Sequence, residues 1–326
     1  MRLAQSPEDF VVDELPLYAP SGEGGHTFVR VEKRMRNTEE VVRALARHAG
    51  VRSGEVGYAG RKDRVAVTRQ WLSVPALDPE RALEFVAEGV RVLEAQRHPH
   101  KLRTGQLRAN RFELVVRELS PPQLAAAAER LMELVRTGMP NRFGPQRFGR
   151  DGRNAEAGRA LLAGERVGRD RRAARFLLSA LQAEVWNACL EARPLALDTV
   201  EAGEVAFVHA SGASFVVEDA AREAARVGSF EISAAGPLFG TRLLSAHGAV
   251  AEREEAVLRD HGVVPGWRPP RGIRLRGARR PYRVRPEQTV CEPVAPDAVR
   301  LCFTLPPGSY ATVLADEVFA TGGTRP

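Results

Sequence analysis

Strand-like patterns cluster at the two ends of this 326-residue chain, and this arrangement constrains the fold most. β-branched and aromatic residues alternate or run together at residues 10–15, 26–31, 67–74, 112–119 and 299–305. Between the early strands, Asn37 and Glu40 predict a helix start and Gly50 a helix end. A second helix is expected from Pro121 to about Gly138. The early part of the chain is therefore predicted to be α/β, with a βαβ-like unit.

The stretch between these ends has a different character. Residues 139–154 are rich in Gly, Pro and Arg, and helical periodicity dominates from there to about residue 261. Residues 171–193 give the clearest amphipathic pattern. Its apolar face is expected to hold Phe176, Ala180, Ala183, Asn187 and Leu190, and to be widened by Leu177, Leu181 and Trp186. We therefore expect a strand-rich domain interrupted by a largely helical insert, with the chain returning to the first domain at its end.

Basic residues are abundant and almost entirely arginine. Only three of the 48 basic residues are lysines, and the net charge of +7 predicts a surface that attracts polyanions. A GC-rich coding bias would produce the same arginine count, so the distribution of arginine matters more than its number. Each of three dense tracts, residues 91–117, 142–175 and 266–285, is by itself typical of a solvated face. Together we expect them to line an RNA-binding cleft between two domains.

Several other classes of protein are excluded. No run reaches the roughly 18 apolar residues of a membrane span, and the N-terminus lacks a secretory signal, so we expect a soluble cytoplasmic protein.

Cys189, Cys291 and Cys302 lie far apart and are expected to be buried free thiols. His98 and His100 lack further ligands at metal spacing and are expected to face phosphate. Phosphate-loop, dinucleotide and hydrolase motifs are missing.

One segment, VGYAGRKDRVAVTRQWLSV at residues 56–74, carries residues suited to catalysis. Two strands flank a loop in which Asp63 lies among Arg61, Lys62 and Arg64. Nearby cations would lower the pKa of the carboxyl and keep it ionised, which suits a nucleophile or base. The alternative is a charged hairpin tip whose aspartate forms surface ion pairs only. Lys62 slightly favours catalysis, because lysine is rare in this chain.

Seven motifs distributed along the chain carry a resemblance to a known family. They are SPEDFVVDE, GYAGRKDRVAVTRQW, HKLRTGQLRANRF, PNRFGPQRFGRDGRN, FLLSALQAEVWN, GPLFG and LPPGSYAT. With them in this order, the chain resembles the TruD-type tRNA pseudouridine synthases over essentially its whole length. The resemblance implies an α/β (α+β) fold: a catalytic domain with a mixed, largely antiparallel sheet at residues 1–138 and 282–326, and an inserted TruD-specific α/β domain at residues 139–281.

The resemblance also implies which residues form the site. The family's catalytic aspartate, in the AGxKD motif, corresponds to Asp63. Its substrate-contacting aromatics correspond to Phe10 and Tyr310, and its Asn-x-Phe pair to Asn110 and Phe112. Without the resemblance, these four positions would be expected in the core or in a turn.

The implied reaction converts uridine-13 of tRNA to pseudouridine. The N1–C1′ bond breaks, the uracil turns over, and C5 joins the ribose, so no metal, nucleotide or redox cofactor is required. The carboxylate could attack the sugar or the base, or abstract a ribose proton; the sequence leaves these routes open. Aromatic stacking, at about 1–3 kcal/mol per base, would help to offset the cost of extruding the uridine.

Some expectations stay open at this stage. Ala4 stands where the family resemblance suggests a lysine, so Lys62 or an arginine would have to support the catalytic carboxylate. The alternatives are an RNA-binding or RNA-chaperone protein with the same fold, and a synthase of this family acting on another RNA site. The expected partner is tRNA, with no membrane or metal. The oligomeric state is not determined, and a monomer is the simplest expectation.

Overall fold

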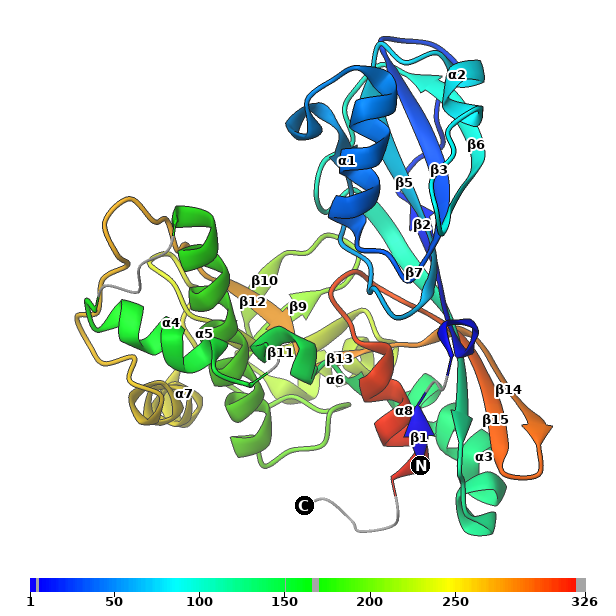
Figure 1. Ribbon diagram of the computed structural model, residues 1–326. Coiled ribbons are helices and arrows are strands. Elements are labelled where there is room, and N and C mark those ends of the chain that lie inside the picture. Colours follow the sequence, from blue (N-terminus) through cyan, green and yellow to red (C-terminus); the bar gives the residue numbers. More distant parts are fainter. Residues whose placement is uncertain (4–5, 150, 166–169, 321–326) are drawn as a thin grey trace. The chain divides into compact units, whose positions relative to one another are not determined.

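The computed structural model describes residues 1–3, 6–149, 151–165 and 170–320 (Figure 1). The chain divides into two compact units, the first built mainly from Met1–Met132 and Pro286–Ala311, the second from Glu133–Arg285. The predicted domain limits at residues 139 and 281 remain a prediction, because a division by compactness does not identify a domain family. Ala4 lies outside the described residues.

A nine-stranded sheet forms the frame of the first unit. Its main path runs β14-β15-β7-β2-β5-β3-β6, with β1 added to β7 and β4 to β5. The strands are β1 (Arg2–Leu3), β2 (Phe10–Pro16), β3 (His26–Arg34), β4 (Gly57–Tyr58), β5 (Val67–Pro75), β6 (Val90–His98), β7 (Leu107–Arg117), β14 (Glu287–Ala295) and β15 (Ala298–Leu305). Strands β2 and β5 are parallel and the other pairs described are antiparallel. The predicted fold class, with a mixed and largely antiparallel sheet, is confirmed.

Helix α1 (Thr38–Ala49) confirms the first predicted helix and its two ends. The main-chain N–H of Asn37 donates to the carboxylate of Glu40 at 2.8 Å, as in a capping box. Gly50 ends the helix in the left-handed conformation, with φ of 73°, where a Cβ atom would be strained. The apolar side of α1 packs on buried valines and leucines of β3 and β5, which holds the helix against one face of the sheet.

The strands on either side of α1 do not form the predicted βαβ-like unit. Strands β3 and β5 are antiparallel neighbours, with His26 opposite Pro75. The parallel neighbour of β5 is β2, where Val12 lies opposite Thr68. The prediction is wrong because the direction in which a strand joins a sheet depends on long-range pairing, which local periodicity does not record.

The remaining helices are distributed over both units. They are α2 (Pro79–Leu83), α3 (Pro121–Thr137), α4 (Asn154–Leu162), α5 (Arg171–Ala192), α6 (Ala220–Gly228), α7 (Gly248–Asp260) and α8 (Ala311–Phe319), with 3₁₀ turns at Pro7–Asp9, Ser53–Glu55 and Pro145–Phe148. Helix α3 confirms the alanine-rich helix predicted from Pro121. None of the helices in the described part of the chain combines the length and hydropathy of a membrane span.

His98, at the end of β6, is a core residue rather than part of a phosphate-facing patch. Its side chain is buried, and its ring lies 5.1 Å from that of Tyr18 and 4.4 Å from that of Phe28, centroid to centroid. Burial lowers the pKa of the imidazole and so disfavours its charged form. The prediction for His98 is therefore wrong, whereas His100 is exposed as expected.

The second unit contains more strand than its helical periodicity predicts. A four-stranded sheet runs β10-β9-β11-β12, and a two-stranded ribbon pairs β13 with β8. The strands are β8 (Met139–Pro140), β9 (Val205–Val208), β10 (Ser214–Val216), β11 (Ile232–Leu238), β12 (Ala278–Pro281) and β13 (Arg283–Val284). The described helices of this unit still cover more residues than its described strands, so the expectation of a largely helical insert is wrong only in leaving out these sheets. These strands are short, and β11 is rich in Ala, Ser and Gly, so their strand signal in the sequence is weak.

Helix α5 is the central helix of this unit, and its predicted apolar face is buried along most of its length. Leu177, Leu181 and Trp186 are fully buried, whereas Phe176 is 41% exposed. The prediction is therefore wrong for Phe176 alone among these residues, because tertiary packing decides which residues at the edge of a wide apolar face are covered.

Arginine in the tract at residues 266–285 is partly a core residue. Arg283 of β13 is 1% exposed and donates to the Ser233 hydroxyl and to the carbonyls of Thr137 and Val227. Its guanidinium lies 4.1 Å from the ring centroid of Phe230, and burial lowers its pKa to about 10. The expectation that this tract faces RNA is therefore wrong for its buried members.

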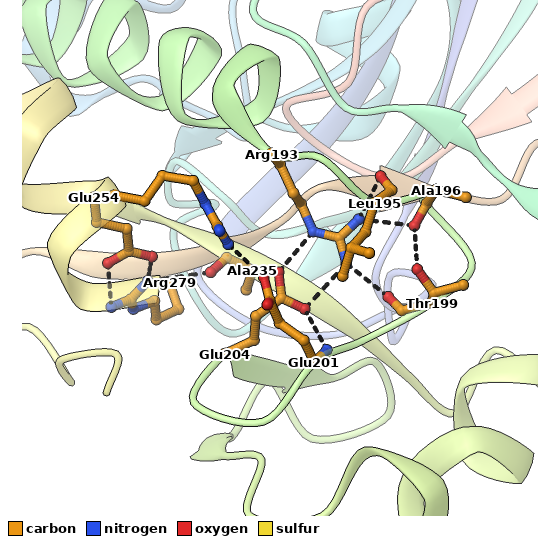
Figure 2. A network of polar contacts seen from close by, with 10 residues as sticks. Arg193, Leu195, Ala196, Thr199, Glu201, Glu204, Ala235, Glu254 and Arg279 are labelled. Carbon is orange, nitrogen blue, oxygen red and sulfur yellow. Dashed lines mark hydrogen bonds and ion pairs between the residues drawn. The ribbon is translucent and has the colours of Figure 1, made fainter. Parts of the chain in front are cut away.

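Two buried ion pairs cross the second unit (Figure 2). Arg193, just after α5, pairs with Glu204 at 2.6 Å, and Arg279 of β12 pairs with Glu254 of α7 at 2.5 Å. The arginine side chains are 2% exposed. Arg193 also donates to three carbonyls, of Leu195, Ala196 and Thr199. Such fully hydrogen-bonded pairs fix the helix end and the strands in one arrangement.

The three cysteines are free thiols, as expected. Cys189 and Cys302 are buried, and burial raises the pKa of the Cys189 thiol to about 12. Cys291 is only half-buried, so the expectation of burial is wrong for this residue.

Candidate active site

The loop at residues 59–66 carries Asp63 and connects β4 to β5. The two strands are antiparallel, with Gly57 opposite Ser73, as the hairpin prediction requires. The main-chain N–H of Lys62 donates to the Thr38 hydroxyl at 3.0 Å, and this hydroxyl donates to Gln70 at 2.9 Å. The first residue of α1 and the middle of β5 thus hold the loop next to Asp63.

Lys62 gives the loop a second anchor. Its ammonium lies 2.5 Å from the carboxylate of Glu14, and both side chains are buried. The other oxygen of Glu14 accepts the main-chain N–H of Trp71 at 3.2 Å. The ion pair therefore ties the loop to β2, and the ammonium of Lys62 is directed to Glu14.

A second buried lysine, Lys33, lies beneath the loop. The sequence analysis did not single it out. Its side chain is fully buried, and its ammonium donates to the main-chain carbonyls of Arg36 and Asp63, each at 2.7 Å. Burial lowers the pKa of this ammonium to about 8. The rarity of lysine, which drew attention to Lys62, applies equally to Lys33 and could have found it.

The carboxyl of Asp63 does not behave as its sequence neighbours predict. Its pKa is raised above the ordinary value, because desolvation outweighs the attraction of Lys33 and Lys62. Asp63 as a whole residue is exposed on its loop, so the desolvation comes from protein atoms around the carboxyl and not from complete burial of the residue. The prediction of a lowered pKa is therefore wrong.

The two arginines beside Asp63 explain this difference, because both are directed elsewhere. Arg61 forms an ion pair with Glu39 at 2.5 Å. Arg64 donates to the main-chain carbonyl of Met35 at 3.4 Å. Proximity in sequence therefore did not bring either guanidinium to the carboxylate.

Asn110 lies on the strand pair to which the loop is tied. In the register of β2 with β7, Asn110 is directly opposite Glu14, and side chains opposite each other share one face of a sheet. The side-chain oxygen of Asn110 is buried and accepts no hydrogen bond from the described residues. A buried oxygen without a donor is costly in a protein unless a ligand supplies one.

An aromatic row continues along the same face. Phe112 lies two residues after Asn110 and opposite Phe303 of β15. The rings of Phe10 and Phe112 are stacked with centroids 6.2 Å apart, and those of Phe112 and Phe303 are 5.4 Å apart. Phe112 is 7% exposed, so its ring is covered by the protein and packs against that of Phe10. Phe10 is only half-buried, so part of it faces solvent.

Phe10 owes its position to the turn before it. The 3₁₀ turn Pro7–Asp9 ends where β2 begins. The carboxylate of Asp9 accepts a hydrogen bond at 2.7 Å from Arg117 of β7. This ion pair fixes the start of β2 against β7 at the residue before Phe10.

Tyr310 is less closely tied to this group. It occupies the N-cap position of α8, five residues after Leu305, and Leu305 lies opposite Asn110 in the register of β15 with β7. The chain path thus leads from the Asn110 position to Tyr310, but contact of its ring with the other site residues stays a prediction. The structure places Phe10, Asn110 and Phe112 on one face of the β2–β7 strand pair, and it ties the Asp63 loop to β2 through the ion pair of Lys62 with Glu14. That Asp63 itself acts together with these three residues stays a prediction.

A groove lined by arginines and glutamates lies on the outer side of α1, and in it Arg36 forms an ion pair with Glu88 at 2.6 Å. Arg43 and Arg47, one helical turn apart, line it together with Arg36, Glu40 and Glu88. Arg43 and Arg47 are exposed. The sequence analysis missed this groove, because these arginines do not belong to a dense tract. Their spacing of four residues on a predicted helix was the available signal.

Comparisons with known proteins agree along nearly the whole chain. The family model of tRNA pseudouridine synthase D (TruD) matches residues 1–168 and 170–318. A tRNA pseudouridine synthase D from an Anaeromyxobacter species is 45% identical, covering 99% of this chain and 94% of the relative. One from Thermus thermophilus is 42% identical, covering 96% and 86%. In fold, the chain is similar to a solved structure assigned to this enzyme from Methanosarcina mazei, with a TM-score of 0.72, 20% identity and coverage of 99% and 94%.

Proposed function

Since this chain belongs to the TruD family of tRNA pseudouridine synthases, we propose that it isomerises uridine-13 of tRNA to pseudouridine and that Asp63 is the catalytic residue. One observation carries the assignment of the site. The loop that presents Asp63 is anchored, through Lys62 and Glu14, to the strand pair that also bears Asn110. A solvated hairpin tip would not need a buried ion pair at its centre.

The geometry suits an isomerisation that rearranges one nucleotide. The bond between N1 of uracil and C1′ of ribose breaks, the base turns over, and a bond forms between C5 and C1′. The proton on C5 is lost and N1 gains one, so atoms and electrons balance without a cofactor. Asp63 acts as nucleophile or base in this step, and it must be ionised for either role.

The neighbouring groups match a uracil turned out of its helix. The buried oxygen of Asn110 accepts no hydrogen bond from the described residues, and the N3–H of uracil is a donor that could satisfy it. Phe10 offers a ring for stacking, and Phe112 holds that ring in place. Tyr310 is proposed as a second stacking ring. Arg43 and Arg47, in the groove on α1, are proposed to contact RNA phosphates.

Asp63→Asn tests this function most directly. Unmodified tRNA transcript is incubated with purified protein, and pseudouridine is mapped at every position. We expect product at position 13 with the wild type and less than about one-thousandth of that rate with Asp63→Asn. A transcript with cytidine at position 13 is the matched control and should remain unmodified.

The same experiment distinguishes the alternatives. If the wild type binds tRNA as tightly as Asp63→Asn does and neither forms pseudouridine, the chain is an RNA-binding protein with this fold. This result would contradict the proposed enzymatic activity. Product at another position would support a different target site. Undiminished activity of Asp63→Asn would overturn the catalytic assignment.

A further inference from the structure

We propose that Lys33 is a positioning residue for the reaction: its buried ammonium holds the main chain at Asp63 and supplies positive charge beneath the carboxylate. This inference rests on the proposed function, because it assigns a role around the proposed catalytic residue. It goes further by identifying which basic group supports Asp63 in this chain.

The first argument is the set of hydrogen bonds. The ammonium of Lys33 donates to the carbonyls of Arg36 and Asp63 at 2.7 Å and lies 3.5 Å from that of Lys62. It thereby joins the segment before α1 to the loop at Asp63. All three acceptors are main-chain atoms, so the bonds fix the backbone rather than another side chain.

The second argument is cost. A buried ammonium is expensive, and it normally pairs with a carboxylate. Lys62 does so with Glu14 at 2.5 Å. The hydrogen bonds of Lys33 to the described residues go to neutral carbonyls, so its positive charge is not cancelled by an ion pair there. An apolar side chain of similar length would pack in its place at lower cost.

The third argument is electrostatic. Lys33 faces Asp63 and Lys62 from the loop and Glu39 and Glu40 from α1. Its attraction for Asp63 is the largest influence that opposes the desolvation of that carboxyl. The uncancelled charge of Lys33 therefore favours the ionised state that catalysis requires.

Lys33→Met tests the proposal, because it keeps the aliphatic stem and removes the ammonium. We expect kcat to fall at least about tenfold with a KM for tRNA within about twofold of the wild type, because the loss is one of positioning and not of binding. The acid limb of the pH profile should move to higher pH, since Asp63 loses an attractive charge. Arg81→Met, which removes another basic group that donates to a main-chain carbonyl, on α2, is the matched control and should leave both unchanged.

The outcomes are separable. Loss of kcat with a displaced acid limb, in protein shown to be folded by circular dichroism, supports the proposal. A Lys33→Met variant with wild-type kcat and pH profile overturns it, while inactive Asp63→Asn would leave the proposed function standing. If Lys33→Met does not fold, Lys33→Arg decides: recovered folding with kcat within about threefold of the wild type supports a requirement for a cation here, and a folded variant as impaired as Asp63→Asn overturns it.

Discussion

At the scale of single residues, the site depends on how each charge is satisfied. Glu14 neutralises Lys62, and Glu39 pairs with Arg61. Asp63 is left with a raised pKa, so folding places this carboxyl where its ionised form is less stable than in water. A functional group is kept at the expense of stability in this way when its reactivity matters.

This raised pKa gives a sign to the pH dependence. A carboxyl whose pKa is higher in the folded state binds more protons there, so stability falls as pH rises from the unfolded value through the folded one. We therefore expect Asp63→Asn to be at least as stable as the wild type at pH 7. The difference should shrink as both states of the wild type become protonated near pH 3. Urea unfolding at a series of pH values measures this.

The pH dependence of the enzymatic rate should have the opposite sign to that of stability. The wild-type rate is expected to fall as pH drops through the raised pKa, at a higher pH than an ordinary aspartate would give. A stability of Asp63→Asn clearly below that of the wild type at pH 7 would contradict the raised pKa.

At the scale of elements, the inner and outer sides of α1 have different roles. Its first residue, Thr38, holds the loop of Asp63, and its apolar side packs on the sheet. Its outer side carries Arg43 and Arg47 in the groove lined by arginines and glutamates. The helical period separates these roles, because it places the apolar residues on one side of the helix and the arginines on the other.

The outer side can be tested through the salt dependence of tRNA binding. Each phosphate contact removed should reduce the slope of log Kd against log salt by about 1. We expect the double variant Arg43→Ala with Arg47→Ala to weaken tRNA binding at low salt and to lower the slope by about 2. Arg222→Ala on α6, another exposed arginine, is the control. An unchanged slope in the double variant would exclude α1 from the RNA-binding surface.

At the scale of the whole molecule, two units with different kinds of core make up the chain. The first has a long sheet covered by α1, and the second has shorter strands around α5 and two buried ion pairs. Buried pairs add little net stability, but removal of one partner leaves an uncompensated charge. The second unit should therefore be sensitive to single substitutions at these pairs.

Glu204→Gln tests this sensitivity. We expect a loss of about 3–5 kcal/mol in the free energy of unfolding of the second unit, because Arg193 keeps its charge without its carboxylate. Hydrogen exchange resolved by unit measures the effect where two units unfold separately. Arg136→Ala, which removes an exposed pair with Glu133, should cost less than about 1 kcal/mol. Equal small effects of the two variants would show that the buried pair is unimportant.

Local signals in the sequence were enough for the elements whose ends carry chemical markers. Asn37 and Glu40 cap α1, Gly50 ends it, and Pro121 begins α3. Periodicity also predicted that the early part of the chain is α/β, whereas the mixed, largely antiparallel sheet was implied by the family resemblance. Motifs in family order were enough to identify the family.

Tertiary structure alone decided which strands are neighbours, which side chains are buried and which charged groups pair. It made β5 the parallel neighbour of β2, turned Phe176 outward and Arg283 inward, and aimed Lys62 at Glu14 rather than at Asp63. It also placed Lys33, which is 30 residues away in sequence, against the carbonyl of Asp63. The physical reason is that charge neutralisation and strand pairing act through space, whereas periodicity and capping act within a few residues along the chain.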